Sequence, residues 1–244
     1  MTGNPTLSPK TFTEAGRVMP GEAMTVQGTV NKTAILLLLT TVAAAYTWQL
    51  FWKGETAFAN LWLMGGAIGG LIMAMITIFK KEWAGVTAPV YAVFEGLFIG
   101  GISSLFEKQF PGIVIQAVML TFGTLAALLA AYTMGLIRAS SGFRRGIFAA
   151  TGGIAILYLV SMVLGLFHIQ IPLIFGAGPV GILFSVAVVI IAALNLVIDF
   201  DFIESGAQQG APKYLEWYGA FGLMVTLIWL YMEILRLLSK LNRR

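Results

Sequence analysis

The sequence predicts an all-α membrane protein with seven transmembrane helices, and two kinds of observation carry this prediction. Of the 244 residues, 58% are hydrophobic and only 11% are charged, and the mean hydropathy is +0.87. A soluble domain carries about 25% charged residues, so this composition excludes a water-soluble surface, a disordered chain and a nucleic-acid-binding protein. The apolar residues also form long continuous runs, whereas membrane β-strands alternate over about ten positions.

Composition divides the chain into three regions. Residues 1–31 are polar and contain three prolines, which predicts a mobile N-terminal tail. Residues 32–240 form a single transmembrane domain with short loops, and residues 241–244 form a basic C-terminal end. The chain has no cysteine, which excludes disulfides and thiolate metal sites.

Seven apolar stretches of 19–25 residues follow the tail. Each is long enough to span a bilayer, which takes about 20 residues in a helix. In chain order, they cover residues 34–52, 58–79, 86–106, 113–137, 146–167, 178–199 and 215–238. Aromatic residues typical of membrane interfaces close the first stretch (Trp48, Trp52) and open the last (Trp217). The second stretch carries Gly-xxx-Gly pairs, which predict close helix packing.

Lysine and arginine predict the orientation. Nine of these cations lie in the tail and in the loops on its side of the membrane, whereas the opposite loops hold only Lys53 and Lys108. The bias predicts a cytoplasmic N-terminus. Arg236, Lys240 and the two terminal arginines would then lie outside, against the rule. We predict that the last helix nevertheless spans the membrane, because residues 215–238 are long and apolar.

Three carboxylates lie within or at the end of an apolar stretch. An acidic group in a membrane is costly and indicates function by default. Glu95 lies near mid-depth in the third stretch, where it would form part of an ion path or a neutral hydrogen bond to a neighbouring helix. Asp199 and Asp201 close the sixth stretch, where the helix C-terminus would disfavour their anions and make them proton sensors. The alternative is a hydrated helix end.

The last stretch holds two further candidates. Glu233 lies about 27 Å along the helix from residue 215, near the face opposite Asp199. We interpret it as an interfacial ion pair with Arg236, one turn away. Thr226 lies about 16 Å along, near the centre.

Enzymatic readings are weak. His168 is the sole histidine, so a multi-histidine metal site is excluded. An intramembrane Ser–His hydrolase would need His168 to reach a serine such as Ser103 or Ser161, and an interfacial role for this histidine is favoured. We therefore expect no enzyme and no bound cofactor.

Motifs in three stretches resemble the transmembrane Bax inhibitor motif family, of the bacterial type. The third contains Glu-Gly-Leu-Phe-Ile-Gly-Gly from Glu95, the sixth ends Ile-Asp-Phe-Asp-Phe-Ile, and the seventh contains Leu-Tyr-Met-Glu-Ile-Leu-Arg. The resemblance covers about residues 30–240. It implies six helices around a central seventh, in a bacterial inner membrane. It also implies a pH-sensitive Ca²⁺ leak, with Ca²⁺ as the transported ion, closed by one aspartate on helix six and one on helix seven.

Carried over to this sequence, the resemblance matches Asp199 to the aspartate of helix six and places Asp201 at the family's glutamine. The partner in helix seven is Glu233 in one alignment and Thr226 in another, and depth favours Thr226. The family's basic residue in helix two is absent, and Lys80 and Lys81 are the nearest candidates. The gate would then rest on Asp199, Asp201 and a lysine.

A second hypothesis is a non-conducting scaffold or regulator of other membrane proteins, such as a quality-control protease. The glycine-rich faces and the polar tail favour it. The expected partners are thus the lipid bilayer and, on this hypothesis, other membrane proteins. The oligomeric state is left open.

Overall fold

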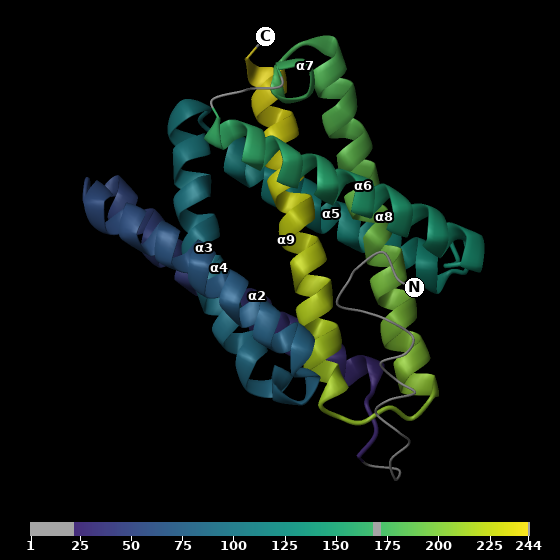
Figure 1. Cartoon of the computed structure of the whole chain (residues 1–244). Helices are drawn as coiled ribbons and strands as arrows, with labels where there is room; N and C mark the ends of the chain where they lie inside the picture. Colours follow the sequence, from purple (N-terminus) through teal and green to yellow (C-terminus); the bar gives the residue numbers. More distant parts are fainter. Residues whose placement is uncertain (1–21, 168–171, 244) are drawn as a thin grey trace. The chain divides into compact units, whose positions relative to one another are not determined.

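The computed structural model describes residues 22–167 and 172–243, and within these ranges it is helical (Figure 1). Seven helices are long and apolar enough to cross a membrane, which confirms the predicted fold class. Their bounds are α2 (Val26–Trp52), α3 (Thr56–Phe79), α4 (Ala84–Gln109), α5 (Ile113–Thr133), α6 (Ser141–Leu166), α8 (Pro179–Gln208) and α9 (Leu215–Asn242). Two short helices accompany them, η1 (Lys81–Trp83) and α7 (Pro172–Phe175).

Local sequence signals explain where several helices begin. The Thr25 side chain accepts a hydrogen bond from the backbone N–H of Gly28 at the start of α2. Ser140 does the same for Phe143 at the start of α6. Such hydroxyl caps satisfy a helix N–H that has no partner within the helix. Because α2 begins at Val26, the last residues of the predicted tail (1–31) are already helical.

Two predicted helix ends are wrong, for the same reason. We expected helix six to stop at Asp199 and helix four to continue to residue 137, whereas α8 ends at Gln208 and α5 at Thr133. Each true end is followed closely by a glycine with positive φ, Gly210 at +66° and Gly135 at +73°. Glycine adopts this left-handed conformation without a Cβ clash, so it ends helices.

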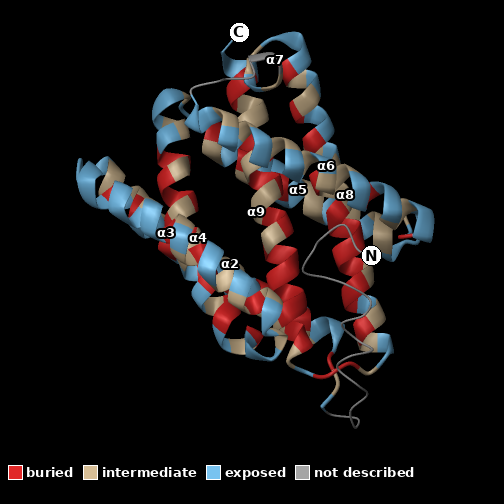
Figure 2. Ribbon diagram, in the orientation of Figure 1, coloured by how far each residue is buried: buried red, intermediate tan, exposed pale blue. Residues whose placement is uncertain are grey.

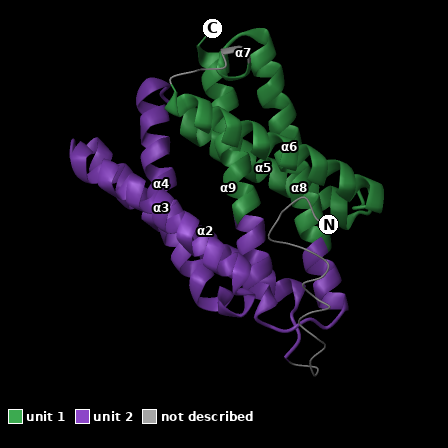
Figure 3. Ribbon diagram, in the orientation of Figure 1, with its two compact units in different colours: residues 1–9, 112–201, 225–244 green, residues 10–111, 202–224 purple. Residues whose placement is uncertain are grey.

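The chain forms two compact units, which Figure 3 shows in different colours. In unit 2 (10–111 and 202–224), α4 packs against both α2 and α3. Glycines allow the close approach. A Cβ on Gly100 would lie 2.7 Å from Cα of Ala44 on α2, and one on Gly66 would lie 2.7 Å from the backbone nitrogen of Phe98 on α4. Backbones that touch in this way are typical of membrane helices.

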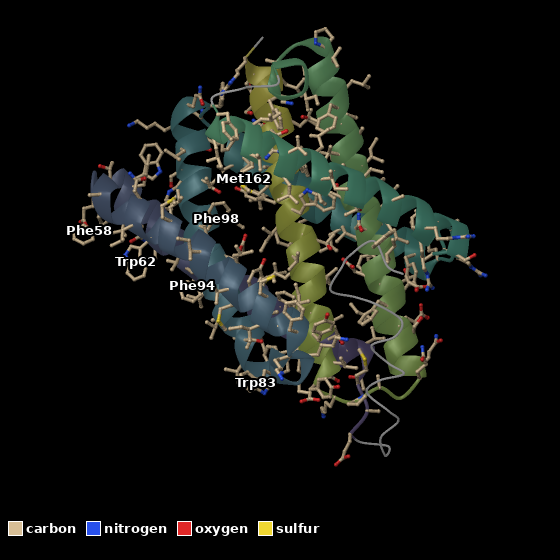
Figure 4. The ribbon with its side chains drawn as sticks, in the orientation of Figure 1. Phe58, Trp62, Trp83, Phe94, Phe98 and Met162 are labelled. Atoms are coloured by element: carbon tan, nitrogen blue, oxygen red, sulfur yellow. The ribbon has the colours of Figure 1, made fainter. Side chains whose placement is uncertain are left out.

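The outer faces of the helices carry large apolar side chains. Phe58 and Trp62 project from α3, and Trp83 projects from η1 (Figure 4). Their exposed fractions are 60%, 37% and 60%. In a membrane these side chains face lipid, where exposure of apolar surface costs nothing.

Unit 1 (1–9, 112–201 and 225–244) contains α5, α6, α7, most of α8 and the second half of α9. Polar contacts join its helices. The Asn195 amide of α8 donates to the Thr151 hydroxyl of α6 at 2.9 Å. Of all the candidate spans, α9 has the largest buried share, 61%, and Figure 2 shows buried residues along its length.

Candidate functional site

Asp199 is the most deeply buried acidic residue among those predicted, with an exposed fraction of 0%. Its neighbours Leu196, Val197, Ile198 and Phe200 are also buried. Because α8 continues to Gln208, Asp199 lies about 14 Å before the end of its helix. The predicted influence of the helix C-terminus on Asp199 is therefore wrong. Asp199 is buried within the length of α8 and does not lie at a hydrated helix end.

The helix register in unit 1 brings Asp199 level with Thr226. Helices α8 and α9 run antiparallel, and the Lys240 ammonium of α9 donates to the Ser185 hydroxyl of α8 at 2.8 Å. Moving 14 residues from this contact along each helix reaches Asp199 and Thr226, both about 21 Å away. Glu233 is seven residues from Thr226, or about 10 Å along α9. The register therefore favours Thr226, which is 3% exposed, as the residue at the depth of Asp199.

Glu233 belongs to a polar cluster with Arg236 and Tyr158. The Arg236 guanidinium donates to both carboxylate oxygens, at 2.9 and 3.1 Å, which confirms the predicted pair. The Tyr158 hydroxyl of α6 donates to the same carboxylate at 2.9 Å and accepts from Arg236 at 2.7 Å. Glu233 is only 2% exposed, so the pair is more enclosed than the interfacial one that we expected. Helical spacing finds Arg236, whereas no sequence signal finds Tyr158.

Asp201 pairs with Arg144 on α6, which was not a predicted partner. The side chains of this pair are 20% and 30% exposed. Asp199 and Asp201 thus have different environments within two residues, because positions two apart occupy different faces of a helix. Asp201 thus pairs with an arginine. That Asp199, Asp201 and a lysine together form a gate stays a prediction.

Glu95 lies at the centre of α4 in unit 2. The space that it fills exists because α3 has a glycine there: a Cβ on Gly70 would lie 2.9 Å from Glu95 Oε2. Tyr91, one turn earlier on α4, lies close enough to interact electrostatically with the carboxyl group. Both neighbours have a sequence signal, since Tyr91 precedes Glu95 by four residues and Gly70 is part of the Gly-Gly-xx-Gly-Gly pattern. Tyr91 lies on the same helix as Glu95, so the predicted hydrogen bond to a neighbouring helix stays a prediction.

The two candidate lysines also lie in unit 2. Lys80 is the C-terminal cap of α3, where its backbone N–H donates to Ile76. The Lys81 ammonium lies 5.9 Å from the centre of the Tyr218 ring. This distance is typical of a cation–π contact. Both positions are at the end of a helix, as the sequence predicted.

An ion pair at the start of α9 was not among the predicted contacts. Glu216 is 1% exposed and pairs with Lys32 of α2. Its carboxylate also accepts from the backbone N–H and the hydroxyl of Thr25, at 2.9 and 3.0 Å. Gly28 leaves the room for it, because a Cβ there would overlap the carboxylate. The contact joins residues 184 positions apart, which single-sequence reasoning cannot pair.

Two of the cations that disagreed with the orientation rule, Arg236 and Lys240, have intramolecular partners. Lys240 is 4% exposed, and its ammonium donates to Ile174 O at 2.8 Å and Gly181 O at 2.9 Å as well as to Ser185. Together with the Arg236–Glu233 pair, this explains how two cations are accommodated at this end of α9.

Replacing Lys240 with methionine should therefore loosen the connection between α6 and α8. The variant keeps the length of the side chain but leaves two carbonyls and a hydroxyl without their shared donor, which costs more than an exposed hydrogen bond. We expect faster hydrogen–deuterium exchange in Pro172–Phe175 and the start of α8, measured by mass spectrometry. The exposed Lys53→Met is the control. Equal exchange in both variants would contradict the claim that Lys240 stabilises the connection between α6 and α8.

No group of three or more metal-binding side chains occurs within residues 22–167 and 172–243. His168, which the hydrolase hypothesis needs, lies outside the described residues.

Comparison with known proteins identifies a family. A family model described as "Bax inhibitor 1 like" matches residues 4–243. No significant match was found among curated proteins or among solved structures.

Proposed function

The chain belongs to the Bax inhibitor 1 like family, and from this premise we propose that it is a pH-sensitive cation leak in which the carboxyl group of Asp199 is the gate. Three things support the proposal: the family, the seven spans, and above all the burial of Asp199 inside α8. A carboxylate at such a position is costly and is retained where ions or protons move.

The mechanism follows from the charge of one residue. When ionised, Asp199 places a negative charge in an apolar interior and attracts a cation. Its carboxylate oxygens, with the Thr226 hydroxyl at the same depth, are ligands that hard cations such as Ca²⁺ prefer. Protonation removes the charge, so the flux should fall as the pH falls.

This mechanism differs from the paired-aspartate latch that the resemblance implied. At the level of Asp199, α9 presents Thr226, which cannot ionise. Position 226 therefore cannot share a proton with Asp199, and in this proposal Asp199 acts by attracting the ion.

The test is cation flux through the full-length protein in phosphatidylcholine liposomes that contain a Ca²⁺ indicator. We expect Ca²⁺ entry above that of empty vesicles, with a decrease through the usual titration range of a carboxyl group. Parallel vesicles with a pH-sensitive dye separate H⁺ from Ca²⁺. Flux equal to that of empty vesicles for both ions would contradict the proposal and would favour the non-conducting regulator.

Thr226→Asp tests the register between α8 and α9. The variant places a second carboxyl group level with Asp199, and two interacting acids lose their protons in two steps. We therefore expect the pH profile of the flux to change from one transition to two. Thr226→Asn, which is similar in size and has no charge, should keep one transition. A single transition in Thr226→Asp would contradict the depth assigned to position 226.

A further inference from the structure

The corner between α5 and α6 concentrates positive charge. Arg138 lies in the connection, and Arg144 and Arg145 lie in the first turns of α6. The sequence contains no aspartate or glutamate between Glu107 and Asp199. Nearby acids on the same stretch of chain therefore do not neutralise this group, which we call the arginine corner (Arg138, Arg144 and Arg145).

Two of these arginines have no ionic partner within residues 22–167 and 172–243. Arg138 and Arg145 are exposed. The Arg145 guanidinium donates to Ser141 O, one turn back, at 3.2 Å, and forms no ion pair with a described residue. Arg144 differs, because its guanidinium donates to Ala139 O at 2.9 Å and pairs with Asp201. The corner thus holds two available cations and one that is shared.

Apolar side chains surround the corner. Met134 and Leu136 in the connection are 66% and 73% exposed, and Phe148 on the next turns of α6 is 39% exposed. Since the connection joins two membrane spans, it lies at a membrane surface, where such side chains meet acyl chains. Guanidinium groups beside apolar surface match a ligand with an anionic head and an apolar tail. Arginine binds phosphate oxygens through paired N–H donors.

We propose that the arginine corner binds the phosphate of an anionic phospholipid headgroup, and that this lipid competes with Asp201 for Arg144. The phosphate would be held by Arg138 and Arg145 and would draw Arg144 away from its carboxylate. Asp201 lies two residues from Asp199 on α8. Bound lipid would therefore change the charge balance on the helix that carries the proposed gate, a consequence that rests on the proposed function.

Lipid binding can be measured independently of flux. Native mass spectrometry of the full-length protein in detergent would count adducts of phosphatidylglycerol and of phosphatidylcholine. We expect a preference for phosphatidylglycerol, and a loss of about tenfold in its affinity in R138Q/R145Q. The control K53Q/K108Q removes two exposed cations elsewhere, one after α2 and one in the last turn of α4, and should bind as the wild type does. Equal losses in both double variants would overturn the site.

The proposed competition for Arg144 also predicts a variant that binds the lipid more tightly. Asp201→Asn releases Arg144, so this variant should bind phosphatidylglycerol more tightly than the wild type. Unchanged or weaker binding would overturn the competition. Soluble glycerol 3-phosphate identifies the source of the phosphate: failure to displace the lipid at equal concentration supports a headgroup, and equally effective displacement overturns it.

Flux measurements test whether lipid at the arginine corner affects the proposed gate. Adding phosphatidylglycerol to the liposomes should change the flux of the wild type and leave that of R138Q/R145Q unchanged, and a response by both would overturn the regulatory part. If no vesicle shows flux while the lipid still binds selectively, the leak fails and the lipid site stands.

Discussion

Arg236→Met is expected to lower the free energy of unfolding by about 3 kcal/mol, at the low end of the range for breaking a buried ion pair. The substitution leaves Glu233, which is 2% exposed, with the Tyr158 hydroxyl but without the guanidinium that contacts both of its oxygens. The low end applies because the Arg236 side chain is 33% exposed, so the pair is only partly enclosed. Thermal unfolding in detergent micelles would measure the loss.

The double variant E233Q/R236M is the control for this prediction. It removes the buried charge together with its partner, so most of the lost stability should return. An Arg236→Met protein as stable as the wild type would show that the cluster does not hold α6 and α9 together. Equal losses in the single and double variants would show that the methionine itself, and not the unpaired acid, is responsible.

Gly100→Ala is expected to cost about 2–3 kcal/mol, although alanine is the better helix former. The added Cβ would lie 2.7 Å from the Ala44 backbone, and backbone cannot rotate away as a flexible side chain can. Either α2 and α4 separate or the variant fails to fold. Unfolding in a titration with a denaturing detergent would show the loss as a lower midpoint.

Gly65→Ala is the matched control, since it makes the same change in α3, a transmembrane helix of the same unit. Nothing lies within 4 Å of the added Cβ there. Helix propensity alone then favours alanine by about 1 kcal/mol. Equal destabilisation by both substitutions would contradict the close approach of α2 and α4 at Gly100.

Much of the fold could be predicted from composition and run length, because a helix that spans a membrane must be apolar over most of its length. The errors concern ends. The carboxylates at Asp199 and Asp201 suggested a stop, but an acid does not break a helix, whereas Gly210 with its positive φ does. Gly135 ends α5 in the same way, but glycines such as Gly66 and Gly100 lie inside helices, so the positive φ that marks these two ends is visible only in the structure.

The candidate site was predictable only where its partners are near in sequence. Glu233 and Arg236 are three residues apart, and Tyr91 and Glu95 are four apart, so helical spacing finds both pairs. Arg144–Asp201, Tyr158–Glu233 and Lys32–Glu216 join different helices, and one sequence contains no information on which helices meet. The position of Thr226 relative to Asp199 could be predicted only in part. Its rise along the helix was predictable, but its alignment with Asp199 needed the contact between Lys240 and Ser185.

The central claim is that the carboxyl group of Asp199 controls cation flow, and the most direct measurement is the pH dependence of Ca²⁺ flux in Asp199→Asn. The control is Glu204→Gln, which neutralises an exposed acid on the same helix. The account predicts that Asp199→Asn has low flux at every pH, because its amide stays neutral, while Glu204→Gln follows the wild type. An Asp199→Asn protein with the flux and pH profile of the wild type would contradict it.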